Sequence, residues 1–113
     1  MESLNGRVVC ITSPSGIGTL LARRFADEGA RIVISAPDLE ELQRVHEELE
    51  RRGVDVFAFP CDATDEGSVR ELVDMAVLWC GRVDVLIMNA SSDGELGRTI
   101  VQILDPPYEH RIS

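Results

Sequence analysis

Residues 7–18 read Arg-Val-Val-Cys-Ile-Thr-Ser-Pro-Ser-Gly-Ile-Gly, an apolar run that leads directly into a turn of small residues. The run 7–12 is rich in β-branched side chains and predicts a strand buried on both faces, as in a parallel sheet. The turn predicts the start of a helix, because apolar residues recur at helical spacing from Ile17 to Phe25. A strand, a glycine turn and a helix in this order form the opening of a βαβ unit.

The same alternation continues to residue 88. Further strands are predicted at 31–35, 54–59 and 83–88, and further helices over about 38–52 and 64–80. Strands that alternate with helices imply parallel pairing through right-handed crossovers. The predicted fold class is therefore α/β, a Rossmann-like, doubly wound parallel sheet of about four strands in the order 3-2-1-4, within three α-β-α layers.

Two regions differ in character. Residues 1–90 carry the alternating pattern and are expected to form one half domain. Residues 91–113 open with a loop, Ser92-Asp93-Gly94, and continue with an apolar stretch over 99–104 that fits a strand or a helix. Asp105-Pro106-Pro107 then interrupts this stretch.

Composition excludes several classes of protein. The chain has 113 residues and a net charge of −9, and all its basic residues are arginine. The absence of a basic patch argues against nucleic acid and an anionic membrane surface as partners. No apolar run approaches the length of a membrane span, and no secretory signal is visible. Cys10, Cys61 and Cys80 are too widely spaced for a zinc motif, so we expect no metal site and free thiols in a cytoplasmic protein.

The glycine turn is the first candidate binding site. A turn between a first strand and a first helix lets backbone N–H groups reach a phosphate at the helix N-terminus. Gly16 and Gly18 would permit a close approach, and Ser13 and Ser15 would add hydroxyl donors. The turn fits equally well a tight connection that binds no ligand.

Five segments at matching spacing give this turn a context. Residues 12–18 resemble a known family's sequence pattern Thr-Gly-x-x-x-Gly-Ile-Gly. Residues 61–65, Cys-Asp-Ala-Thr-Asp, resemble a second pattern of that family, Cys/Leu-Asp-Val-Thr-Asp. Residues 88–91, Met-Asn-Ala-Ser, resemble a third pattern, Asn-Asn-Ala-Gly. The connecting segments 29–34 and 81–86 are also typical of that family. On these segments the chain resembles the short-chain dehydrogenase/reductase (SDR) family from about residue 6 to residue 89.

The resemblance implies an NAD or NADP site. It places Gly16, Ile17 and Gly18 against the pyrophosphate, Asp62 on the adenine amino group with Ala63 beside the ring, and Asn89 and Ala90 along the adenosine ribose. An alternative for Asp62 is a loop carboxylate that caps the third helix. An alternative for Asn89 is a turn residue that bonds the neighbouring backbone.

Two departures from the family pattern concern the cofactor. The turn is one residue shorter than the family's, and Ser13 and Pro14 occupy the region of its first glycine. Ala36 stands where an NAD site usually has an acid, and no arginine lies beside it for the 2′-phosphate of NADP. The lack of a basic residue favours NAD, and Asp38 is more simply a helix cap.

The family's catalytic residues, a Ser and a Tyr-x-x-x-Lys pair, have no match. The chain has no lysine, and its one tyrosine is Tyr108. Residues 104–109 resemble the segment that opens the next family helix, so the chain is expected to be truncated before the catalytic residues. We therefore assign no catalytic residue and expect an NAD(P)-binding domain without oxidoreductase activity of its own. The alternatives are an oxidoreductase completed by a partner chain, and a scaffold that binds no cofactor.

The predicted sheet ends on an apolar strand, 83–88. An exposed strand of this kind pairs readily with another chain. The backbone groups of this edge could pair with a second copy, be covered by the tail 91–113, or cause aggregation. A homodimer through 83–88 is the favoured expectation.

Overall fold

Eight elements follow one another along the chain in the computed structural model, which describes residues 4–12, 17–62, 64–90 and 98–109. They are β1 (Val8–Thr12), α1 (Ile17–Asp27), β2 (Arg31–Ser35), α2 (Leu39–Arg51), β3 (Val56–Ala58), α3 (Glu66–Cys80), β4 (Val83–Ala90) and β5 (Arg98–Tyr108). The first seven elements alternate between strand and helix, as the sequence predicts.

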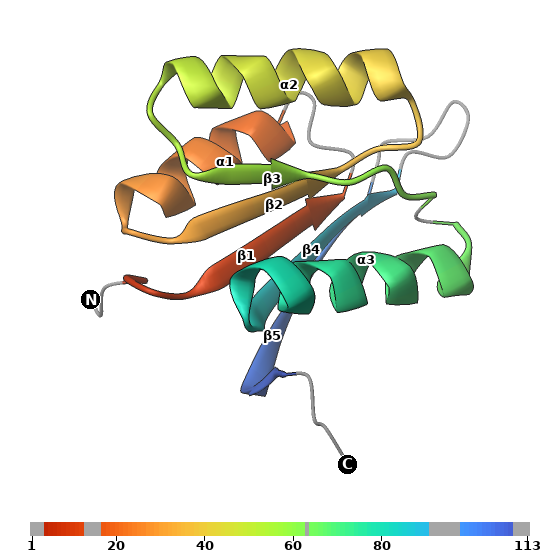
Figure 1. Cartoon of the computed structure of the whole chain (residues 1–113). Coiled ribbons are helices and arrows are strands. Elements are labelled where there is room, and N and C mark those ends of the chain that lie inside the picture. Colours follow the sequence, from red (N-terminus) through yellow and green to blue (C-terminus); the bar gives the residue numbers. More distant parts are fainter. Residues whose placement is uncertain (1–3, 13–16, 63, 91–97, 110–113) are drawn as a thin grey trace.

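The strands form one sheet in the order β3-β2-β1-β4-β5. The four strands β3, β2, β1 and β4 are parallel, which confirms the predicted order 3-2-1-4. Helices α1 and α2 cover one face of the sheet and α3 covers the other, so the molecule has three α-β-α layers (Figure 1).

The core lies on both faces of β1, where all five residues are buried. Val9 and Ile11 pack into the cluster under α1 and α2, whereas Val8 and Cys10 pack into the cluster under α3. This division follows from the alternation of side chains along a strand. It explains why the sequence of β1 is apolar without interruption.

Two aspartate side chains and a glycine fix the ends of the helices described next. The Asp38 carboxylate caps α2 by accepting from the backbone N–H of Glu40 at 2.9 Å, and Asp65 caps α3 in the same way through Gly67. Gly81 ends α3 with a φ of 88°, in the left-handed region that favours glycine. These caps set where each helix begins and ends relative to the sheet.

A buried carboxylate ties β4 to β1 at the amino ends of the strands. Asp84 accepts hydrogen bonds from the Val8 N–H at 2.8 Å and from Arg82 Nη2 at 2.7 Å, and Arg7 lies 3.4 Å away. These bonds fix the relative position of the two strands whose opposite ends frame the candidate site.

The C-terminal segment differs from the prediction. Residues 104–109 were expected to open a helix, and this expectation is wrong, because Arg98–Tyr108 is a fifth strand, antiparallel to β4. Each residue that precedes a proline is disfavoured in the helical region, which keeps Asp105 and Pro106 extended. The apolar stretch before them pairs with the edge of β4, and the pairing shifts between Ile103 and Tyr108, where the two prolines lie.

The edge of β4 is consequently occupied. Seven residues of β5 pair with β4, from Arg98 opposite Ala90 to Tyr108 opposite Val83. The homodimer expected through residues 83–88 therefore has no free β4 edge to use. The structure shows that the chain's own tail covers this edge, which is one of the three arrangements considered from the sequence.

Other features of the described ranges bear on partners and thiols. None of the helices there combines the length and the apolar character that a membrane span requires. No three His, Cys, Asp or Glu side chains in those ranges come together as a metal site. All three cysteines are free, and burial raises the pKa of the Cys10 thiol well above its usual range.

Candidate functional site

The candidate site lies at the carboxyl edge of the parallel strands. Thr12 pairs with Ser35 of β2 and with Met88 of β4, so the carboxyl ends of three strands lie side by side at this edge. Helix α1 starts at Ile17, shortly after β1 ends, and Gly18 is buried in its first turn. An open α/β sheet binds its ligands at this kind of edge, where helix N-termini offer N–H groups.

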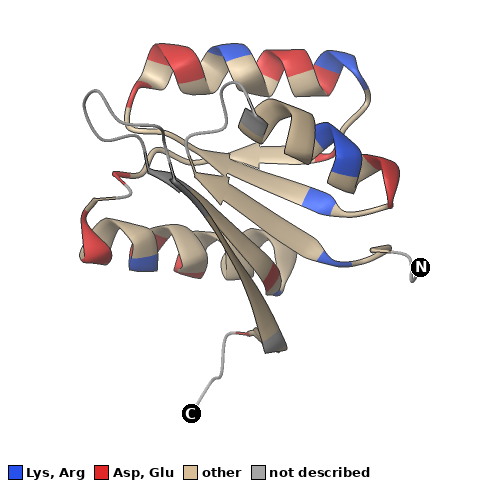
Figure 2. Cartoon of the chain, turned by 180° about the vertical axis from the view of Figure 1, so that it is seen from behind, with Lys and Arg blue, Asp and Glu red and all other residues tan. Residues whose placement is uncertain are grey.

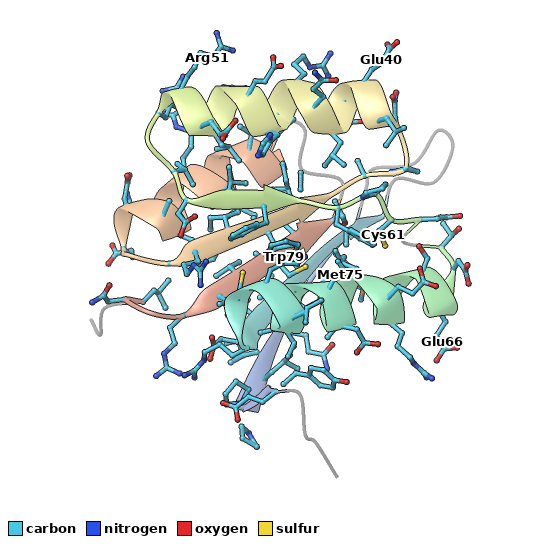
Figure 3. All side chains as sticks on the ribbon, in the orientation of Figure 1. Glu40, Arg51, Cys61, Glu66, Met75 and Trp79 are labelled. Atoms are coloured by element: carbon cyan, nitrogen blue, oxygen red, sulfur yellow. The ribbon has the colours of Figure 1, made fainter. Side chains whose placement is uncertain are left out.

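All three helices present their first turns at the same end of the molecule. Figure 3 shows Glu40 in the first turn of α2 and Glu66 in the first turn of α3 at the end where Cys61 lies. Arg51, in the last turn of α2, lies at the opposite end. The partial positive charges of the helix N-termini therefore gather on the carboxyl side of the sheet, where an anionic ligand is stabilised.

The end of β2 contains a buried hydroxyl group, that of Ser35. Among the described residues, no group hydrogen-bonds to Ser35 Oγ, although the side chain is fully buried. Ala36 follows and is also buried, and its carbonyl accepts from the Cys61 N–H at 3.3 Å. This bond brings the segment after β3, which contains Asp62, next to the end of β2.

Asp62 is exposed and its carboxylate is held in a local turn. Asp62 Oδ1 accepts from the Thr64 N–H at 2.9 Å and from Thr64 Oγ1 at 2.6 Å. The Asp62 N–H donates to Ser68 Oγ at 2.9 Å. The hydrogen bonds from Thr64 lower the pKa of Asp62, so the side chain is an ionised acceptor at neutral pH.

The structure separates two readings of Asp62. The N-cap of α3 is Asp65, whose carboxylate accepts from Gly67 N at 3.1 Å. Asp62 supports the turn before the helix instead of capping it. The adenine role of Asp62 remains a prediction, and its position beside Ala36 is compatible with that role.

The two candidate residues on β4 are its last two, Asn89 and Ala90. Asn89 follows Met88, the partner of Thr12, and so continues β4 beyond the end of β1. Both residues also pair with β5, through Thr99 and Arg98. Their backbone thus lies at the carboxyl edge together with Ala36 and Asp62.

Several predicted site residues lie outside the described residues: Ser13, Ser15, Gly16 and Ala63. Their assignment to the pyrophosphate and to the adenine ring stays a prediction. Ile17 is described as the first residue of α1, and its assignment to the pyrophosphate also stays a prediction.

Sequence reasoning missed two residues at this edge. Ser35 carries a buried, unpartnered hydroxyl within the described chain, and Ser68 accepts from the backbone of Asp62. Ser35 was visible only as the last residue of a predicted strand. Ser68 lies six positions after Asp62, and no local sequence pattern predicts a hydrogen bond between the Asp62 N–H and a side chain in the first turn of α3.

Comparison with curated proteins shows what the chain is similar to. It is 36% identical over 92 residues to a 7alpha-hydroxysteroid dehydrogenase of Escherichia coli K12, covering 80% of this chain and 36% of that protein. It is 37% identical over 90 residues to a fatty acyl-CoA reductase of Acinetobacter baylyi, covering 79% of this chain and 30% of that protein. The chain thus spans about a third of the length of these relatives.

Solved structures give the same result. A short chain dehydrogenase from Mycobacterium smegmatis superposes with a TM-score of 0.76 at 37% identity, over 83% of this chain and 40% of that one. Actinorhodin polyketide ketoreductase with NADPH gives a TM-score of 0.74 at 35% identity, over 83% and 36% of the two chains. NAD+-bound xylitol dehydrogenase gives 0.68 at 33% identity, over 74% and 32%.

The match extends through the whole parallel part of the sheet. The model of the family described as short chain dehydrogenase covers residues 7–103, from the start of β1 into β5. The strand order agrees with that match. The chain therefore belongs to the short chain dehydrogenase family.

Proposed function

We propose that this chain binds a nicotinamide dinucleotide at the carboxyl edge of its sheet and has no oxidoreductase activity by itself. The observation that carries the proposal is the meeting of the α1 N-terminus, Ala36 and Asp62 at the ends of β1 and β2. Relatives with this fold were solved with NADPH and with NAD+. The free cysteines fit a reducing compartment, and we assign the chain to the cytoplasm.

The adenosine half of the cofactor fits the described residues. The ionised Asp62 carboxylate is an acceptor for the adenine amino group, and Thr64 fixes its orientation. Ser35 Oγ is a buried hydroxyl with no partner within the described residues. A group of this kind usually forms its hydrogen bonds with a ligand or with water. In this proposal Ala63 lies beside the ring, and Asn89 and Ala90 lie along the ribose.

The pyrophosphate is assigned to the turn that precedes α1. Ser13, Ser15, Gly16, Ile17 and Gly18 would supply N–H and hydroxyl donors there, as the family resemblance implies. The buried Gly18 in the first turn of α1 leaves the helix N-terminus without a side chain at that position. A dinucleotide carries its negative charge on these phosphates, which is the charge that a helix N-terminus attracts.

The segment after β2 favours NAD over NADP. Ala36 is buried and Asp38 is committed to capping α2, so neither binds a ribose. Residues 35–38 contain no arginine or lysine to neutralise a 2′-phosphate. We therefore expect NADH to bind more tightly than NADPH.

The position of the single tyrosine argues against catalysis by the chain alone. When bound, the dinucleotide supplies hydride transfer, and the protein must add a proton donor near the reacting carbon. Tyr108 pairs with Val83, the first residue of β4, and its hydroxyl donates to Asp74 at 3.3 Å. It therefore lies at the amino edge of the sheet, opposite the candidate site.

The test is a calorimetric titration of the full chain with NADH and then NADPH. We expect one-to-one binding, tighter for NADH. Replacement Asp62→Ala is expected to weaken binding by about 1–3 kcal/mol, the usual cost of an unpaired partner. The matched control is Asp55→Ala, which removes an exposed carboxylate just before β3, at the amino edge.

Three results would contradict the proposal. If a folded sample gives no binding heat, the chain is a scaffold that binds no cofactor. Equal weakening by Asp62→Ala and Asp55→Ala would mean that the site is assigned wrongly. Turnover of a carbonyl substrate with NADH by the isolated chain would contradict the assigned lack of activity.

A further inference from the structure

Strand β5 ends the sheet on an open edge. It is the longest strand, with 11 residues, and among the described residues it has β4 on one side and no strand on the other. In an antiparallel pair every second residue directs its N–H and C=O away from the partner strand. Over residues 99–104, before Pro106 and Pro107 remove two N–H groups, β5 therefore presents a row of backbone donors and acceptors to a further strand.

Apolar side chains flank this edge on both faces. Val101 and Ile103 lie opposite Ile87 and Val85 and are 55% and 74% exposed, on the face that α1 and α2 cover elsewhere. Ile100, on the other face, is 49% exposed. Among the described residues, no helix lies over the face of β5 that is seen from behind (Figure 2), whereas on the other face α3 contacts the end of the strand, where the Tyr108 hydroxyl donates to Asp74.

Charge makes this edge different from the rest of the chain. The net charge is −9, so two copies repel each other over most of their surface. Residues 99–104, Thr-Ile-Val-Gln-Ile-Leu, contain no charged residue and no proline. Uncharged edges without proline lack the features by which proteins prevent strand pairing.

The segment is complementary to itself. When two copies of β5 run antiparallel and centre on Gln102, Val101 of one copy lies opposite Ile103 of the other, on one face of the sheet. Ile100 lies opposite Leu104 on the other face, and Gln102 meets its own counterpart.

We propose that β5 is a homodimer interface, at which a second copy of this chain adds in antiparallel register centred on Gln102. The two sheets then form one continuous sheet of ten strands, built from the five-stranded sheet of each copy. The two-fold axis is perpendicular to the sheet, so the carboxyl edges of the copies face opposite directions. The dimer therefore leaves both proposed cofactor sites open and does not depend on them.

The first test is sedimentation velocity of the full chain over a range of concentrations. We expect a monomer–dimer equilibrium. Gln102→Glu puts two carboxylates directly opposite each other and is expected to raise the dimer dissociation constant by about tenfold. Ala58→Glu adds the same charge on the exposed end of β3, at the other edge of the sheet, and should leave the constant unchanged.

The second test is disulfide trapping, which does not require a destabilising variant. In a Cys80→Ser background, Gln102→Cys is expected to cross-link under mild oxidation, because opposed Cα atoms lie within the about 4.4–6.8 Å that a disulfide spans. Ile100→Cys is the control, since residue 100 is offset from its counterpart by four positions, roughly 13 Å along the strand. Cys10 and Cys61 are buried and remain in both proteins.

The outcomes separate the alternatives. A monomer at all concentrations, growth beyond a dimer, or a dimer weakened by Ala58→Glu and not by Gln102→Glu would overturn the proposal. Equal cross-linking at positions 100 and 102 would overturn the register. Failure of cofactor binding would leave the dimer result unaffected, because the two sites share no residue.

Discussion

Asp84 is the residue on which the amino ends of β1 and β4 depend. Its side chain is only 6% exposed and accepts from Arg82 and from the backbone of Val8. Burial by itself raises the pKa of this carboxyl, but the hydrogen bonds from Arg82 and Val8 and the Arg82 charge outweigh burial, and the net pKa is lowered. A buried charge with these partners stabilises the fold only while all of them are present.

We predict that Asp84→Ala lowers the free energy of unfolding by about 3 kcal/mol, because it leaves the buried Val8 N–H without its acceptor. The measurement is urea unfolding followed by circular dichroism. Asp55→Ala is the control, since the exposed Asp55–Arg31 pair is expected to contribute less than about 1 kcal/mol. Equal losses for the two variants would contradict the structural role of Asp84.

The lowered pKa of Asp84 also predicts a pH dependence. A carboxyl whose pKa is lower in the folded state stabilises the protein above its unfolded pKa, about 3.9 for an aspartate, and loses this contribution as the pH falls through the folded value. The difference in unfolding free energy between the wild type and Asp84→Asn should therefore be constant near neutral pH and shrink below about pH 4. Denaturant titrations at several pH values measure it, and a difference that does not change with pH would contradict the assignment.

Single residues were unequally visible in the sequence. Asp38 and Asp65 were predictable caps, because each precedes an apolar helical pattern. Asp84 was visible as the one charge within an apolar strand, but its bond to Val8, 76 positions away, depends on strand pairing. The Ser35 hydroxyl, which has no partner in the part of the chain that the structure describes, could not be predicted, because burial of a strand end depends on what packs over it.

At the scale of elements, the N-cap of α2 gives a direct test. Asp38→Ala removes the acceptor for the Glu40 N–H and is expected to lower the unfolding free energy by about 1 kcal/mol. Asp38→Asn keeps an acceptor and should cost only a small part of this. Thermal unfolding compares the two variants. A large effect on NADH affinity from either variant would mean that Asp38 contacts the ribose instead of acting only as a cap.

The parallel strands and their helices were predictable because local patterns and packing agree there. The strand at 31–35 was predicted to the residue, and β3 and β4 differ from the predictions only at their ends. β5 was not predictable as a strand. Its apolar run fits either element, and the open edge of β4 decides between them through contacts that are distant in sequence.

The whole molecule was predictable as far as the alternation of elements extends. Right-handed crossovers and apolar strands predict a doubly wound parallel sheet, 3-2-1-4 is its Rossmann-type order, and the carboxyl edge follows from that order. The fifth strand changes the edge that the molecule offers to partners, from β4 to β5. The candidate site does not include β5, because its residues come from the segments that follow β1, β2 and β3 in the sequence and from the last residues of β4.

The measurement that tests the central claim most directly is a titration of the isotope-labelled full chain with NADH, followed by amide NMR shifts. The account predicts saturable shifts at Gly18, Ala36, Asp62 and Asn89, at the carboxyl edge, and none at Asp55 and Gly81, at the amino edge. Shifts confined to the amino edge, or no shifts at saturating NADH in a folded sample, would contradict a dinucleotide site in this position.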